Sequence, residues 1–272
     1  MSSKKSKNNE QKMESVKGPL SSLLGENLAV LEKVFDSCED IVFHHLSIHN
    51  VSGCLVFFKE MTNSHTLNEL KQILSTLEKG GEGSLTKDSL KDFIHTHFSV
   101  IDSSKASEWQ AVIDKLLSGQ SVLLIDQYDE ALCFDSQELV SRAITEPEME
   151  RTVRGPKEGF VENLGLNLQL IRKKLRSPNL KAEQLTLGTQ TKTKVTILYI
   201  KGITNDRLVS EMRERLSRIS IDGVLSSHYV ESMIQDAPFS PFPTILNTDR
   251  PDRVTADLLE GKVGILVDGS PE

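Results

Sequence analysis

The sequence predicts an α/β protein with two similar lobes, each a small mixed sheet flanked by helices. Three observations lead to this prediction. Two blocks of residues recur at one fixed offset, helical and strand-like periodicities follow in the same order in both halves, and a highly charged stretch separates the halves. A chain of 272 residues is long enough for two small domains.

The repeat is clearest in two blocks that share an offset of 142 residues. Val56–Asn63 reads apolar, aromatic, apolar, Lys, any residue, apolar, Thr, Asn, and this pattern recurs in Leu198–Asn205. The Leu-Leu-x-Gly of residues 116–119 recurs at 258–261. Two independent blocks with one offset indicate an internal duplication.

A looser third block pairs Glu26-Asn27-Leu28 with Glu162-Asn163-Leu164, at an offset of 136 residues. From the repeat as a whole we expect residues 53–126 and 195–268 to superpose as the same local fold.

In the first half, the spacing of Leu24, Leu28, Leu31 and Phe35 is typical of an amphipathic helix. The same kind of argument extends along the half. It predicts helices over 23–35, 66–77, 86–97 and 105–117, and strands over 41–48, 53–58, 121–126 and 131–135, the last as an edge strand.

The second half repeats this order of elements. It predicts helices over 157–175, 205–218, 226–235 and 251–260, and strands over 183–189, 194–201 and 263–268. Neighbouring strands joined by a short polar turn indicate antiparallel hairpins. A strand, a helical crossover and a second apolar strand indicate a partly parallel sheet in each lobe.

Composition narrows the classes of function. The net charge is −7, so an acidic body of this kind is a poor nucleic-acid binder. No apolar run approaches the ~20 residues of a membrane-spanning helix. Three distant cysteines fit a reducing compartment and favour neither disulfides nor zinc.

Charge and composition also divide the chain. We expect a disordered basic tail over 1–18, an N-terminal lobe over 19–137, a charged linker over 138–158 and a C-terminal lobe over 159–272. The tail carries five lysines and two glutamates, and contact of these lysines with anionic lipid is an alternative to simple disorder.

Six residues are candidates for binding a ligand or a partner. Asp126 and Asp268 end buried strands at equivalent repeat positions, where α/β sheets often bind ligands, although starting a turn is the commoner role of Asp. Arg142, Glu146, Arg154 and Glu158 lie in the linker, and the arginines offer bidentate pairing to carboxylates. A solvated charged tether is the other interpretation of this segment.

Motifs of catalysis are missing from the sequence. It contains no phosphate-binding G-x-x-x-x-G-K-[ST] loop, no G-x-S-x-G elbow and no H-E-x-x-H pair. His44 and His45 are adjacent, so on a strand they point to opposite faces and do not form a metal site. We therefore expect no enzyme activity, no cofactor and no metal.

The linker and the second half contain a series of short motifs: Arg142, Glu146-Pro147, Arg154-Gly155-Pro156, Glu158-Gly159-Phe160, Glu162-Asn163-Leu164, Ile171-Arg172-Lys173, Thr191-Lys192-Thr193, Pro241-Phe242-Pro243, Arg250-Pro251-Asp252, Leu259–Val263 and Val267–Pro271. In these motifs the chain resembles the GerA family of spore germination receptor A subunits. The resemblance is strong over about 140–271, weaker over 38–126 and absent over the tail. The first half departs from the family at Phe57–Glu60, where an aromatic residue and a glycine are more usual.

This resemblance implies the N-terminal domain of a nutrient germinant receptor subunit, lying on the spore core side of the spore inner membrane. It implies a membrane domain that this chain lacks, and B-type and C-type partner subunits, with self-association as a further expectation. The main hypothesis is a non-catalytic module for signalling and assembly. The alternative is a module that binds a small-molecule germinant or an ion in a cleft between the lobes.

Overall fold

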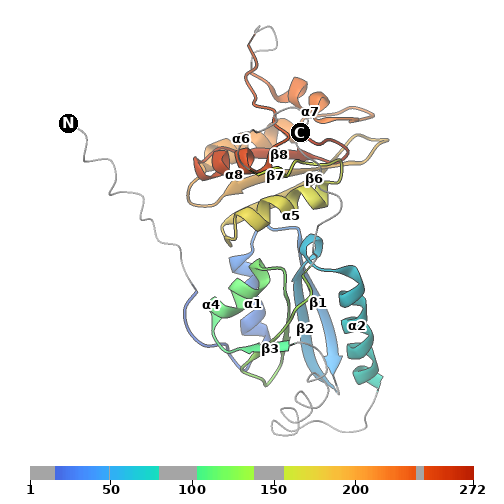
Figure 1. Cartoon of the computed structure of the whole chain (residues 1–272), viewed down its shortest axis with the longest axis vertical. Coiled ribbons are helices and arrows are strands. Elements are labelled where there is room, and N and C mark those ends of the chain that lie inside the picture. The colour runs from blue at the N-terminus through green and yellow to red at the C-terminus, as the bar shows by residue number, and fades with distance from the viewer. Residues whose placement is uncertain (1–15, 49, 80–102, 138–155, 237–241) are drawn as a thin grey trace, which may run out of the picture.

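The computed structural model describes residues 16–48, 50–79, 103–137, 156–236 and 242–272, which form two lobes stacked along the long axis of the molecule (Figure 1). The first lobe contains a five-stranded sheet and the second a three-stranded sheet. Residues 1–15 of the expected tail, the helix expected over 86–97 and nearly all of the expected linker lie outside the described residues.

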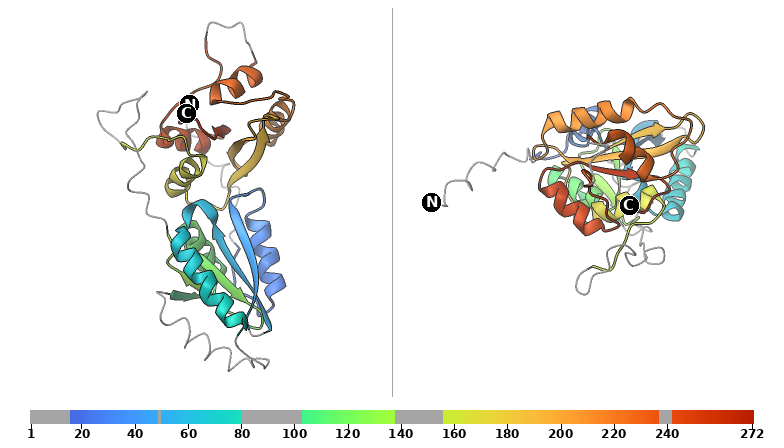
Figure 2. Two further views of the ribbon diagram at one scale, coloured as in Figure 1. Left: turned by 90° about the vertical axis from the view of Figure 1, so that its right-hand side faces the viewer. Right: turned by 90° about the horizontal axis from the view of Figure 1, so that it is seen from above.

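The first-lobe sheet has the strand order β1-β2-β4-β5-β3. Its strands are β1 (Ile41–Ile48), β2 (Val51–Phe58), β4 (Ser121–Ile125), β5 (Ala131–Phe134) and β3 (Ser103–Ala106). Strands β2, β4 and β5 are almost wholly buried, because helices cover both faces of the sheet. These helices are α1 (Leu24–Val34) and α4 (Trp109–Leu117) on one face and α2 (Ser64–Lys79) on the other (Figure 2), with a short 3₁₀ turn, η1 (Lys59–Met61), after β2.

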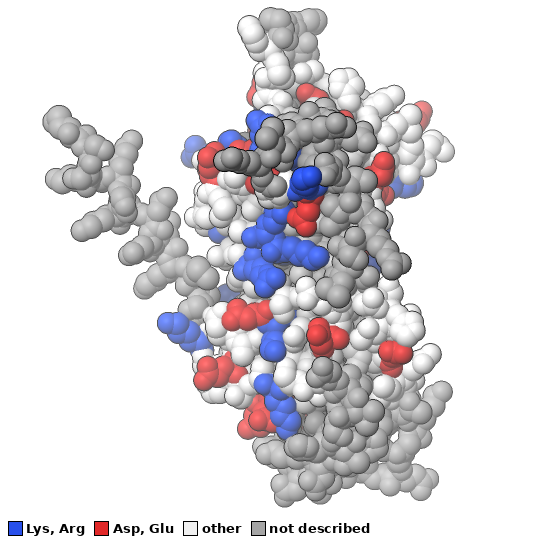
Figure 3. Space-filling view, viewed as in Figure 1, with Lys and Arg blue, Asp and Glu red and all other residues white. Residues whose placement is uncertain are grey.

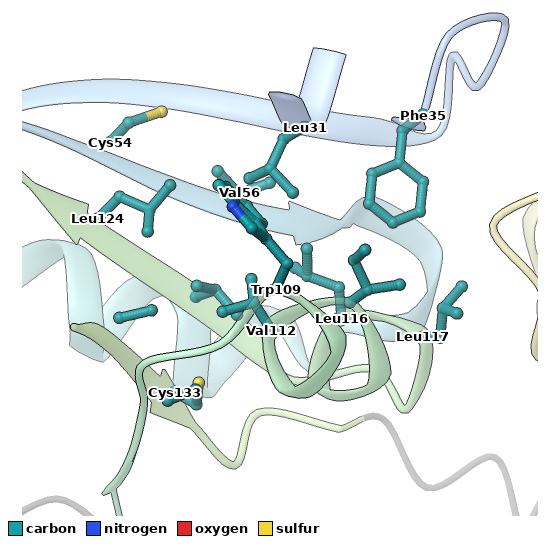
Figure 4. Packing of buried hydrophobic residues seen from close by; sticks show 14 of the residues in the cluster. Leu31, Phe35, Cys54, Val56, Trp109, Val112, Leu116, Leu117, Leu124 and Cys133 are labelled. Atoms are coloured by element: carbon teal, nitrogen blue, oxygen red, sulfur yellow. The ribbon is translucent and has the colours of Figure 1, made fainter. Parts of the chain in front are cut away.

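The core beneath α1 and α4 forms because both helices place apolar residues on one stripe. Trp109 lies in the centre of this layer, against Leu31 of α1 and Val56 of β2 (Figure 4). The thiols of Cys54 and Cys133 are buried in the same layer and form no disulfide.

The second-lobe sheet has the order β6-β7-β8 and is likewise covered on both faces. Its elements are α5 (Leu164–Lys174), β6 (Leu180–Leu187), β7 (Thr193–Ile200), α6 (Asp206–Ser217), α7 (Ser227–Ile234), α8 (Pro251–Leu259) and β8 (Gly264–Val267). Helices α5 and α8 pack on one face, and α6 and α7 on the other. Asn205 caps α6 through its side chain, and Pro251 occupies the first turn of α8.

The two lobes share details of strand register. In the first, Gly53 of β2 pairs with Ile125 of β4, and in the second, Val195 of β7 pairs with Val267 of β8. Both members of the pair are shifted by the same 142 residues found in the sequence. The turn glycine after α4, Gly119, has a φ of 89°, and its counterpart after α8 has a φ of 87°.

A buried asparagine in each lobe fastens the segment before its first helix. The Asn27 amide accepts from the backbone N–H of Ser21 at 3.0 Å and donates to its carbonyl at 2.7 Å. Asn167 does the same with Val161, at 2.8 and 2.6 Å. The counterpart of Asn27 is therefore Asn167 and not Asn163, which corrects the third repeat block. Asn163 instead caps α5.

The prediction of a partly parallel sheet in each lobe is wrong. All strand pairs that the described part of the chain forms within its two sheets are antiparallel. The handedness rule applies to a single crossover between neighbouring parallel strands. Here several elements lie between β2 and β4, and between β7 and β8. The last of these elements is α4 in the first lobe and α8 in the second. It returns the chain to the end of the sheet where β2 or β7 finishes, so the next strand runs antiparallel.

Three smaller expectations also need correction. Strand β5 lies between β4 and β3, so it is not an edge strand. The helix expected from residue 105 is preceded by β3 and begins at Trp109. The helix expected from residue 157 begins at Leu164, since the residues before it form the turn that Asn167 fastens. Among the described helices, none is long and apolar enough to cross a membrane.

Candidate functional site

The two aspartates at the strand ends hold helix N-termini. Asp126 Oδ1 accepts from the backbone N–H of Leu24, the first residue of α1, at 2.9 Å. Asp268 Oδ1 accepts from the N–H of Leu164, the first residue of α5, at 3.2 Å. A carboxylate at a helix N-terminus satisfies an otherwise unpaired donor and complements the helix dipole. A role of these aspartates in binding a ligand or a partner stays a prediction.

Of the four linker candidates, only Glu158 lies within the described residues. Arg142, Glu146 and Arg154 fall outside them. The Glu158 carboxylate pairs with Lys174 Nζ at 2.6 Å, in the last turn of α5. This contact ties the entry of the second lobe to the helix that faces the first lobe.

A buried ion pair lies where the lobes meet. Arg172 of α5 reaches across to Asp40, which precedes β1, and binds it through two nitrogens, with Nη2 at 2.7 Å from Oδ1. The two side chains are 2% and 7% exposed. The guanidinium also lies 4.4 Å from the ring centroid of Phe58, at the end of β2.

A second carboxylate of the first lobe binds two lysines of the second. Asp36 lies 2.6 Å from Lys181 Nζ and 2.6 Å from Lys201 Nζ. Lys181 is almost fully buried and also donates to the carbonyl of Val34 at the end of α1. Partial burial works to raise the pKa of Asp36, but the hydrogen bonds and charges of the lysines outweigh it and hold the pKa below its usual value.

Backbone hydrogen bonds join the lobes beside these ion pairs. Ala182 donates to the carbonyl of Ser37 at 3.0 Å, and the N–H of Glu39 donates to the carbonyl of Ala182 at 3.1 Å. On the other side of the junction, Gly165 approaches Glu60 so closely that an added Cβ would lie 2.3 Å from the carboxylate. We call the contacts of Asp36, Asp40, Arg172, Lys181 and Lys201 the interlobe junction.

Positive charge extends from the interlobe junction onto the surface over α5. On the face drawn in Figure 3, Lys and Arg side chains gather over α5, whose last turn is basic. Acidic side chains lie to either side of this group.

The three cysteines are free and buried. Burial raises the pKa of Cys38, which lies at the junction, and the pKa values of Cys54 and Cys133 to about 12 and about 11. Protonated thiols are poor nucleophiles at neutral pH. In the described part of the chain, no group of His, Cys, Asp and Glu is arranged to hold a metal ion.

Sequence reasoning missed the junction, although one signal pointed to it. Leu164 and Leu168 follow the buried stripe of α5, and Arg172 comes next at the same four-residue spacing. An arginine on the buried stripe of a helix needs a carboxylate partner. Nothing in the sequence names Asp40 as that partner, because the two residues lie 132 positions apart.

Comparison with known proteins gives the family. The sequence-family model described as Bacillus/Clostridium GerA spore germination protein matches residues 29–272. The chain belongs to the GerA family of spore germination proteins. It is 38% identical over 255 residues to spore germination protein B1 of Bacillus subtilis, covering 91% of this chain and 51% of that protein. It is 30% identical to spore germination protein KA of the same organism, covering 93% of this chain and 46% of the relative.

A solved structure agrees with the fold. The N-terminal domain of the A subunit of the Bacillus megaterium spore germinant receptor GerK3 matches with a TM-score of 0.68 and 32% identity, over 94% of both chains. The resemblance to germinant receptor A subunits read from the sequence is thereby confirmed. This GerA-family chain spans about half the length of the curated relatives it matches.

Proposed function

We propose that this chain is the signalling and assembly domain of a nutrient germinant receptor A subunit, and that it is not an enzyme. It works with B-type and C-type subunits and couples to a membrane domain of the receptor, from the spore core side of the inner membrane. The family and the solved relative support this proposal. Its physical basis is the interlobe junction.

The observation that carries the proposal is the buried pair of Arg172 and Asp40. A buried ion pair adds little net stability compared with apolar packing, but loss of one partner is costly. Such a pair therefore favours one relative placement of the lobes over others. An interface with discrete arrangements is what converts a small change at one site into a movement at another.

The test uses two lysines of equal exposure. Lys201 pairs with Asp36 across the junction and Lys262 pairs with Asp257 inside its own lobe, and the two lysines are 55% and 56% exposed. We expect Lys201→Glu and Lys262→Glu to leave the isolated domain folded. Only Lys201→Glu should slow germination of spores at normal subunit levels. Equal germination of both variants would contradict the proposal.

A second candidate function is binding of a small-molecule germinant between the lobes. The pair of Asp36 and Lys201 favours it, because both groups are partly exposed and together offer opposite charges to a zwitterion. A thermal-shift screen with amino acids, sugars and nucleosides tests this function. A ligand at 100 times its Kd adds roughly 2.7 kcal/mol of stability.

We also propose that the lobes derive from one duplicated unit, with limits at 19–137 and 159–272. The register shared by β2–β4 and β7–β8 supports this. The segment 138–158, with Arg142, Glu146, Arg154 and Glu158, is proposed to set the angle between the lobes or to bind a neighbouring subunit. The contact between Glu158 and Lys174 supports the first of these roles.

A further inference from the structure

The outer edge of β8 differs from the same edge in the first lobe. Strand β4 has β2 on one side and β5 on the other, and all of its residues are buried. Strand β8 has β7 on one side, and no strand of the described residues pairs with it on the other. Its first two residues, Gly264 and Ile265, are only partly buried. An apolar sheet edge left in this state is a template for strand addition.

A hollow of about 390 Å³ lies along this edge. Residues 244–248 line it together with β8, and apolar residues of the helices, such as Val230 of α7 and Leu258 of α8, complete its wall. The helical layers on both faces of the sheet thus border the hollow, as they would border the position of a missing strand.

The far wall of the hollow corresponds to β3 of the first lobe. The 142-residue offset carries Ser103–Ala106 onto residues 245–248. The flanking hydrogen bonds agree with this match, since Leu20 donates to the carbonyl of Ser107 at 2.9 Å and Phe160 donates to the carbonyl of Asp249 at 2.8 Å. In the first lobe, β5 fills the space between β4 and β3. The hollow occupies the same space in the second lobe.

The turn after β8 already aims the chain at this space. The backbone N–H of Tyr128 donates to the carbonyl of Ile125 at 3.3 Å, and the backbone N–H of Ser270 donates in the same way to the carbonyl of Val267 at 3.2 Å. The preceding residue has a positive φ in both turns, 65° at Gln127 and 84° at its counterpart. In the first lobe this turn leads directly into β5. In the second it leads to Glu272, which lines the hollow.

We propose that the hollow is the seat of a further antiparallel strand, supplied in longer chains of this family by the residues directly after Glu272. The offset carries Ala131–Phe134 to those positions. The strand would place small residues toward α5 and α8, as Ala131 and Cys133 face α1 and α4. It would place large apolar residues toward α6 and α7, as Leu132 and Phe134 face the α2 layer.

Added to the present chain, a copy of Ala131–Gln137 after Glu272 tests this proposal. One control extension has Asp in place of the copied Leu132 and Phe134. A second control has Pro in place of the copied Leu132, which removes a backbone donor. Amide hydrogen exchange of Gly264–Val267 and of residues 245–248 is measured for each, with the melting temperature.

We expect the first extension to slow exchange at Gly264–Val267 by roughly tenfold or more. It should raise the melting temperature by roughly 4 °C or more, and neither control should do so. Equal exchange and melting for the three extended chains would overturn the proposal. Slow exchange with the proline extension as well would mean that the added residues fill the hollow through side-chain packing alone. That result would also overturn the proposal of a further strand.

Discussion

Arg172 of the second lobe and Asp40 of the first form a bidentate ion pair that is almost completely shielded from water. Burial works to lower the pKa of Arg172, but the charge and hydrogen bonds of Asp40 hold it above its usual value. The guanidinium therefore stays charged in a place where a lone charge would be costly.

Removing one partner of this pair should destabilise the domain strongly. We expect Asp40→Ala to lower the free energy of unfolding by about 3–5 kcal/mol, because it leaves a buried charge without its partner. The double variant Arg172→Met, Asp40→Leu should lose much less, since no charge is then buried. Urea denaturation measures both.

The matched control for this prediction is an exposed pair. Glu214 and Arg218 are 55% and 72% exposed, so Glu214→Gln should change stability by about 1 kcal/mol or less. If Asp40→Ala costs no more than Glu214→Gln, the buried pair does not hold the lobes together.

Asp36 should give the domain a dependence on acid. Its pKa in the folded chain lies below the ordinary value of 3.8, so the folded state favours its ionised form. The stability this adds is fully present above the pKa of the unfolded chain, and it is lost as the pH falls through the folded pKa. Denaturation of the parent chain and of Asp36→Asn should differ at pH 6, and the difference should shrink toward pH 2. A difference that stays constant with pH would contradict this.

The two turn glycines should respond alike to substitution. Gly119 and Gly261 both have positive φ, and an added Cβ would lie 3.1 Å from the carbonyl oxygen of Met61 or of Ile203. We expect Gly119→Ala and Gly261→Ala each to cost about 1–2 kcal/mol. Gly25→Ala, in α1, meets no atom within 4 Å and should be neutral or stabilising by up to ~1 kcal/mol. Loss of stability at only one of the two turns would argue against equivalent lobes.

Charge reversal of Glu158 distinguishes two roles of the segment 138–158, a passive linker and an element that couples the lobes or subunits. Glu158 is 42% exposed and pairs with Lys174, so Glu158→Lys should shift the melting temperature of the isolated domain by a few degrees at most. In the intact receptor it should block the germination response at normal subunit levels. Normal germination would reduce the segment to a tether, and an unfolded variant would show that its role is structural.

Local elements were largely predictable from the sequence. The helices expected over 66–77, 205–218 and 251–260 lie within about two residues of α2, α6 and α8, because apolar periodicity and caps mark them. The hairpin of β6 and β7 followed from its short polar turn.

Long-range pairing was less predictable. Whether β2 and β4 run parallel depends on the path of every element between them, which periodicity does not reveal. The partner of Arg172 was hidden for the same reason. The repeat predicted that Asp126 and Asp268 are equivalent, but their contacts with the helix N-termini depend on tertiary structure.

The most direct test of the signalling role is germination of spores whose receptor carries Asp36→Asn. This change removes the negative charge that Lys181 and Lys201 share, without adding bulk. With subunit levels verified by immunoblot, we expect the germination rate to fall roughly tenfold, within the usual range of coupling between sites. A germination rate equal to that of the parent receptor would contradict the claim that the interlobe junction transmits the signal.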